Sequence, residues 1–168
     1  TMAHSWVMDY PSEYEAFKAY AESYPDNCLL LVDTYDTLRS GIPNAIKVFK
    51  ELREKGYEPK GIRLDSGDLA YLSKKARKMM DEAGLTETII CVSGDLDERS
   101  INSLIQQGAK IDSWGVGTKL ITSEDLPALG GVYKMSAVHE NGEIVPKIKI
   151  SETEAKITNP GLKTTYRI

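Results

Sequence analysis

The residues of this chain with the clearest chemical potential are Arg63 and Asp65, at the end of a short apolar run. Such a run bounded by polar and glycine residues predicts a β-strand. Side chains alternate along a strand, so Arg63 and Asp65 should point to the same side. An arginine binds a phosphate or carboxylate through two parallel hydrogen bonds, and an aspartate accepts hydrogen bonds from hydroxyl groups. The alternative is a purely structural ion pair.

Ser66 and Gly67 follow at once, before a segment with helical periodicity. The N–H groups and the dipole at the start of a helix favour an anion. An ordinary helix cap at Ser66 or Asp68 is the structural alternative.

Two further segments of small and polar residues follow apolar runs later in the chain. Ser93, Gly94 and Asp95 follow the run that ends at Val92. Gly115, Gly117 and Thr118 lie at the end of the run that begins at Ile111. Glycine lets the backbone approach a ligand closely, and successive amides can bind an anion. Taken alone, each of these segments is typical of a turn, and Asp95 is a possible helix cap.

His4 is a candidate nucleophile, because a neutral imidazole can attack a phosphoryl group. Its spacing alone is more typical of a solvated side chain, and His139, beside a turn, is expected to be structural or exposed. Asp33 should lie where the first strand ends. The residues just after it, Thr34 among them, are expected to cap or to be solvated.

These residues need a scaffold that brings strand ends together. Apolar runs that predict strands cover residues 28–33, 61–64, 88–92 and 111–116. Helical patterns cover residues 11–24, 42–55 and 69–83, and run from Asp95 or Asp97 to Gln107. Strands about 25–30 residues apart match βαβ units, so we expect α/β architecture with a parallel sheet whose carboxyl edge binds the ligand. Four such strands are half of an eight-stranded barrel. An open doubly wound sheet, or a dimer of two completing halves, is the alternative.

The pattern changes after Ser123. Residues 132–139 and 143–150 flank Asn141-Gly142, a strong signal for an antiparallel hairpin, and Pro146 indicates an edge strand. Residues 163–168 are a possible last strand. We therefore expect a single domain over 1–168, with βα units in 1–123 and the hairpin and last strand in 124–168.

Composition narrows the function classes. The 168 residues are 41% hydrophobic and carry 21 basic and 25 acidic side chains. Without a basic stripe or aromatic ladder, nucleic acid is not an expected partner. No apolar run approaches about 18 residues, so no membrane span is expected. We expect Cys28 and Cys91 to be free, buried thiols, which fits a reducing cytoplasm. A disulfide between them is the alternative.

Six segments together resemble one known family. They are Thr1-Met2-Ala3-His4-Ser5, Leu31-Val32-Asp33-Thr34-Tyr35-Asp36-Thr37, Arg63-Leu64-Asp65-Ser66-Gly67-Asp68-Leu69, Ser93-Gly94-Asp95-Leu96-Asp97-Glu98, Gly115-Val116-Gly117-Thr118 and Leu129-Gly130-Gly131-Val132-Tyr133-Lys134. In this order they resemble nicotinate phosphoribosyltransferase. The resemblance implies a partial (β/α) barrel of the type II phosphoribosyltransferase kind, ending in an antiparallel hairpin.

The resemblance also implies a reaction. Nicotinate and phosphoribosyl pyrophosphate give nicotinate mononucleotide and pyrophosphate, the first step of NAD salvage from nicotinate. ATP is a co-substrate through a phosphorylated histidine, which the match places at His4, and Mg²⁺ accompanies the pyrophosphate. Ser5 would lie near the substrate and Arg63 would face the nicotinate carboxylate or the phosphates.

The remaining roles are implied in the same way. Asp65 would bind ribose or Mg²⁺-linked groups, and Ser66 and Gly67 belong to the same substrate-binding segment. The residues expected to hold ribose and the 5′-phosphate are Gly94, Asp95, Gly115, Gly117 and Thr118, and Ser93 is a further expected substrate-binding residue. No protein metal ligand is expected.

The match covers only the later part of the family's barrel domain. Both ends of the chain look cut, so we expect a piece of a longer enzyme that forms a homodimer. In the family, an aromatic residue of the neighbouring subunit helps to stack the pyridine ring, so the chain alone is expected not to turn over. A related nicotinamide or quinolinate enzyme, and a non-catalytic ligand-binding module, are the alternatives.

Overall fold

The computed structural model describes residues 2–167, and the chain divides into two compact units. One unit ends at Pro127 and the other begins at Ala128. Thr1 and Ile168 lie outside the described residues. Among residues 2–167, no helix is both long and apolar enough to cross a bilayer.

The first unit is built on a parallel sheet in the order β1-β2-β3-β4. Its strands are β1 (Leu29–Leu31), β2 (Gly61–Leu64), β3 (Ile89–Val92) and β4 (Ser113–Trp114). The order follows the chain without reversal, as in a (β/α) barrel, whereas a doubly wound sheet reverses its order at a switch point. The expected partial barrel is therefore confirmed, and the doubly wound alternative is wrong for these strands.

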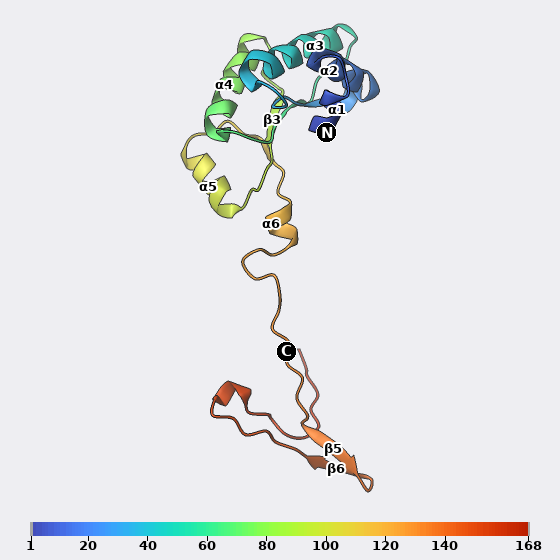
Figure 1. Ribbon diagram of the computed structural model, residues 1–168, viewed down its shortest axis with the longest axis vertical. Coiled ribbons are helices and arrows are strands. Elements are labelled where there is room, and N and C mark those ends of the chain that lie inside the picture. The colour runs from blue at the N-terminus through green and yellow to red at the C-terminus, as the bar shows by residue number, and fades with distance from the viewer. Residues whose placement is uncertain (1, 168) are drawn as a thin grey trace. The chain divides into compact units, whose positions relative to one another are not determined.

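Helices precede and connect the strands (Figure 1). They are α1 (His4–Met8), α2 (Glu13–Ser23), α3 (Ile42–Glu54), α4 (Leu69–Glu82), α5 (Glu98–Gln106) and α6 (Thr118–Ile121). The four long helices match the sequence prediction to within a few residues. The short α1 was not expected, and it places His4 inside a helix instead of before one.

The helix caps explain where α2, α4 and α5 begin. The Ser12 side chain accepts from the Glu15 N–H. Asp68 caps α4, so Ser66 does not. Asp97 caps α5 in a capping box with Ser100, so Asp95 does not.

The sheet has two chemically different faces. Leu30, Ile62, Leu64, Ile90 and Val92 are buried in the core, together with residues of α2, α3 and α4 such as Phe17, Phe49 and Met80. On the opposite face the register places Leu31, Arg63, Cys91 and Ser113 in one row. In a barrel this second face is the interior, so the polar strand ends open into it.

Arg77 fastens the end of α4 to the loop before β3. Its guanidinium donates to the carbonyls of Leu85 at 2.6 Å and Thr88 at 2.5 Å, and to the Asp81 carboxylate at 2.8 Å. We expect Arg77→Met to lower the free energy of unfolding by about 2 kcal/mol, because the Thr88 carbonyl loses its side-chain donor and the link to Asp81 is lost, whereas the Leu85 carbonyl keeps the Thr88 hydroxyl as a donor. Denaturant unfolding measures this. Lys78→Met, at a 71% exposed side chain, is the control and should stay within about 0.5 kcal/mol of wild type. Equal effects of the two changes would contradict the role given to Arg77.

The second unit contains the antiparallel pair β5 (Ala137–Glu140) and β6 (Glu143–Pro146). Asn141 and Gly142 both have positive φ, at 50° and 86°, as a type I′ turn requires. The hairpin is confirmed, but its strands are shorter than expected. Residues 163–167 form no strand in the described structure, so the possible last strand is wrong. A short 3₁₀ turn covers Glu154–Lys156.

Candidate active site

The carboxyl ends of β1, β2 and β3 bring polar side chains to one edge of the sheet. Asp33 follows β1, Asp65 and Ser66 follow β2, and Ser93 follows β3. Hydrogen bonds join all four, and so the loops converge as the strand pattern predicted.

Arg63, Asp65 and Ser93 form the first half of this cluster. Arg63 donates through Nη2 to Asp65 at 2.8 Å and through Nε to the Ser93 hydroxyl at 2.7 Å. Ser93 in turn donates to the same Asp65 oxygen. The hydrogen bond from Ser93, and then the Arg63 guanidinium, hold the pKa of Asp65 below its usual value although partial burial opposes this. The structural ion pair expected as an alternative therefore exists, and it lies inside the cluster.

Asp33 forms the second half. Its Oδ2 accepts from the Asp65 N–H at 2.9 Å and from the Ser66 hydroxyl at 2.6 Å. The Asp33 side chain is only 2% exposed, and its Oδ1 is buried without a hydrogen-bond partner among the described residues. A buried carboxylate oxygen without a donor is costly, which is typical of an atom that meets a ligand or a moving proton.

His4 lies over both carboxylates. Its Nε2 is 3.9 Å from Asp33 Oδ1 and 3.8 Å from Asp65 Oδ2, beyond hydrogen-bond distance, and its Nδ1 is 3.0 Å from the Thr34 hydroxyl. The side chain is 39% exposed. α1 therefore holds the ring against the strand ends, while part of the side chain stays exposed.

Two glycines lie in close packing. Gly94 has a φ of 95°, and a Cβ there would lie 2.4 Å from the Asp65 carbonyl oxygen. A Cβ at Gly115 would lie 3.1 Å from the Ser93 Cβ. Their packing brings the loops after β3 and β4 against the Asp65–Ser93 pair. Whether a ligand also uses this open backbone stays a prediction.

The structure brings together seven of the residues predicted for the site. These are His4, Arg63, Asp65, Ser66, Ser93, Gly94 and Gly115. No hydrogen bond or ion pair found within residues 2–167 ties the other five to this cluster. They are Ser5, Gly67, Asp95, Gly117 and Thr118.

Sequence reasoning underrated two residues. Asp33 was placed at the strand end but not among the site residues, and Thr34 was expected to cap or to be solvated, whereas it contacts His4. Asp36 does cap, accepting from the N–H groups of Leu38 and Arg39. The position of Asp33 and Thr34 directly after a buried strand was the signal that could have marked them.

A pH dependence follows from Asp65. A lowered pKa in the folded state stabilises the protein above the ordinary carboxyl pKa of about 3.9, and this contribution is lost as pH falls through the lowered value. Ser93→Ala removes the largest cause of the shift. We expect this variant to be less stable than wild type at pH 7, with the difference shrinking below about pH 4. Denaturant unfolding at both pH values, with Ser23→Ala as the control, measures it. A difference that does not depend on pH would contradict the assignment.

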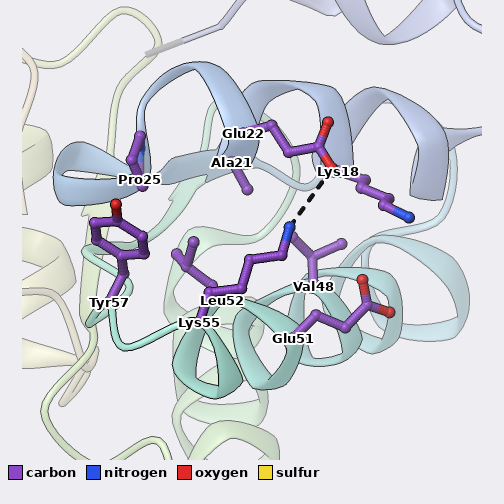
Figure 2. A pocket seen from close by; sticks show the side chains of 9 residues that line it. All are labelled: Lys18, Ala21, Glu22, Pro25, Val48, Glu51, Leu52, Lys55 and Tyr57. Atoms are coloured by element: carbon purple, nitrogen blue, oxygen red, sulfur yellow. Dashed lines mark ion pairs between the residues drawn. The ribbon is translucent and has the colours of Figure 1, made fainter.

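A separate hollow of about 150 Å³ lies between α2 and α3 (Figure 2). It is lined by the C-terminal ends of both helices and crossed by an ion pair between Lys55 and Glu22 at 3.6 Å. Since these helix ends lead into β1 and β2, the hollow lies at the opposite end of the strands from the polar cluster. None of the predicted site residues lines it.

The charges of the polar cluster limit what it can bind. Two carboxylates, Asp33 and Asp65, face one guanidinium, Arg63, and an imidazole that can take up a proton. A polyanion would be repelled here unless it brought its own cation. The cluster suits hydroxyl groups, a cationic centre, or a phosphate accompanied by a metal ion.

Several curated proteins are similar to this chain in sequence. No family model matches the chain. Curated relatives named nicotinate phosphoribosyltransferase are 61% identical in Bacillus subtilis over all of this chain, 49% in Dictyostelium discoideum over 94% of it and 39% in Homo sapiens over 95%. These matches cover 34%, 27% and 30% of the relatives, so the chain spans about a third of their length.

Solved structures are similar in fold as well. The crystal structure of human nicotinic acid phosphoribosyltransferase is 33% identical with a TM-score of 0.59, over 67% of this chain and 26% of that one. The crystal structure of nicotinate-nucleotide pyrophosphorylase from Pyrococcus furiosus is 25% identical with a TM-score of 0.58, over 73% of this chain and 31% of that one.

Proposed function

Because this chain belongs to the nicotinate phosphoribosyltransferase family, we propose that its strand-end cluster is part of a site that makes nicotinate mononucleotide. The bond between the anomeric carbon of phosphoribosyl pyrophosphate and its bridging oxygen breaks, and pyrophosphate leaves with the electron pair. The nicotinate ring nitrogen forms the new bond to that carbon. The observation that carries the proposal is the convergence of His4, Asp33, Arg63 and Asp65 at one edge of the sheet.

The electrostatics support this reaction class. Glycosyl transfer builds positive charge on the ribose ring, and carboxylates placed beside it stabilise that charge. The Asp65 oxygen that faces His4 is not the one used by Arg63 and Ser93, so it accepts no hydrogen bond from either of them. We assign Asp65 to the ribose ring or to groups linked to Mg²⁺.

Arg63 is the anion-binding residue of the proposal. Its contacts with Asp65 and Ser93 use Nε and Nη2 of a guanidinium that carries five N–H donors. The fork is thereby held in a fixed orientation, and its other donors suit a carboxylate or a phosphate. Substrate contacts at Ser5, Ser66, Gly67, Ser93, Gly94, Asp95, Gly115, Gly117 and Thr118 remain part of the proposal.

Mg²⁺ fits the donor set as a companion of the pyrophosphate. Two carboxylates against one guanidinium leave a local excess of negative charge that disfavours a bare polyanion. Mg²⁺ keeps several waters and is bound largely through substrate phosphates, so few protein ligands are needed. When bound, it would neutralise the leaving pyrophosphate.

ATP enters the proposal through His4. The imidazole would accept a phosphoryl group from ATP. Hydrolysis of the resulting phosphohistidine would drive the transfer reaction. Asp33, with a buried oxygen near Nε2, is placed to stabilise the positive charge on the ring.

A homodimer and a cytoplasmic location belong to the same proposal, and two free cysteines agree with a reducing compartment.

The test is the binding of phosphoribosyl pyrophosphate with Mg²⁺ to this chain, measured by calorimetry. We expect Arg63→Met to weaken binding at least tenfold, and Arg39→Met, at a 90% exposed side chain, to leave it unchanged. Absence of binding by the wild-type chain, or equal binding by both variants, would overturn the assignment.

A further inference from the structure

The two ring nitrogens of His4 have different surroundings. Nδ1 is 3.0 Å from the Thr34 hydroxyl, a hydrogen-bond distance. Nε2 is 3.8 Å or more from the nearest carboxylate oxygens, those of Asp65 and Asp33. One nitrogen is therefore held by the protein, and the other is left for chemistry at a partly exposed edge of the ring.

The partner of Nδ1 is a hydroxyl, and this has a consequence for the reaction. A hydroxyl both donates and accepts, whereas a carbonyl or carboxylate only accepts. Thr34 can donate to Nδ1 when Nε2 carries the proton, and it can accept from Nδ1–H when Nε2 is unprotonated or covalently modified. The ring can thus change its protonation state without losing this contact.

We propose that Thr34 is a positioning residue that holds His4 by Nδ1, so that Nε2 is the atom that accepts the phosphoryl group. This inference rests on the proposed function. Thr34 fixes the orientation of the ring, and it accepts from Nδ1–H in the tautomer in which Nε2 has a lone pair. The short loop that gives Asp33 to one side of the ring gives Thr34 to the other.

The phosphoryl step balances with these groups. The Nε2 lone pair attacks the terminal phosphorus of a nucleoside triphosphate, and the bond from that phosphorus to the bridging oxygen breaks, its electron pair leaving with the diphosphate. Nδ1 keeps its proton and donates a hydrogen bond to the Thr34 hydroxyl. In the later hydrolysis water takes the phosphoryl group, and Nε2 recovers its lone pair.

The ring itself provides the first test, and it needs no ligand. The chain has two histidines, so the ¹⁵N resonances of His4 and His139 can be separated by His139→Gln. We expect Thr34→Val to shift the His4 ring nitrogens and its tautomer balance, Thr34→Ser to restore the wild-type spectrum, and His139 to stay constant in both. Wild-type His4 resonances in a folded Thr34→Val variant, judged by its amide spectrum, would overturn the inference.

The second test uses ATP with Mg²⁺ and ³¹P spectroscopy, which separates the two phosphohistidine isomers. We expect the Nε2 isomer in wild type and in Thr34→Ser, and at least a tenfold slower labelling or a mixture of isomers in Thr34→Val. An Nδ1 isomer in wild type would overturn this inference and leave the proposed function intact. No label in wild type would count against the proposed function, and the ring spectra would still decide the role of Thr34.

Discussion

His4→Gln should leave no acid-labile phosphate on the chain after incubation with ATP and Mg²⁺, whereas the wild-type chain should be labelled. Glutamine retains polarity and approximate size but has no nitrogen that can accept a phosphoryl group. The ring that it replaces lies within 3.9 Å of both Asp33 and Asp65 and is the candidate nucleophile of the cluster. Radiolabel from the terminal phosphate of ATP, retained in base and lost in acid, measures the effect.

The matched control is His139→Gln, which changes the other histidine of the chain. His139 lies on the β5–β6 hairpin of the second unit, and we expect its replacement to leave the label unchanged. A label that survives His4→Gln and disappears with His139→Gln would reverse the assignment. A wild-type chain that takes up no label would remove ATP coupling from the proposal.

The scaffold could be predicted from the sequence because its signals are local. A buried parallel strand is a continuous apolar run, and α2, α4 and α5 begin at residues whose side chains accept from their own first turn. The strand order β1-β2-β3-β4 needed coordinates, because an apolar run does not say which strands lie beside it. Residues 163–167 have a strand-like sequence but form no strand in the described structure, so a local pattern of this kind is not sufficient.

The site could be predicted in part, for a related reason. Arg63 and Asp65 alternate on one strand, so their contact follows from the strand itself. The contact between His4 and Thr34 spans 30 positions and depends on how α1 packs against the sheet. The position of Thr34 directly after a buried strand places it at this edge of the sheet, but no local pattern pairs it with His4. The family motif identified His4, but nothing in the sequence identified the hydroxyl that holds it.

Gly94, which follows β3, links the packing of the strand ends to the geometry of the site. Gly94→Ala should be the most damaging small substitution in the cluster. Gly94 has a φ of 95°, and an added Cβ would lie 2.4 Å from the Asp65 carbonyl oxygen. The left-handed backbone and the overlap together should lower the free energy of unfolding by about 3 kcal/mol. Because relief of the overlap must move Asp65 away from Ser93, the pKa of Asp65 should rise and binding of phosphoribosyl pyrophosphate should weaken.

Gly84→Ala separates strain from overlap. Gly84 also has a positive φ, of 77°, but an added Cβ there meets nothing within 4 Å. This change should cost only about 1 kcal/mol and leave ligand binding unaltered. Denaturant unfolding and calorimetry with the two variants decide the matter. If Gly94→Ala were no more harmful than Gly84→Ala, the loop after β3 would be able to move away from Asp65, and the close packing of the strand ends would not be what holds Asp65 in place.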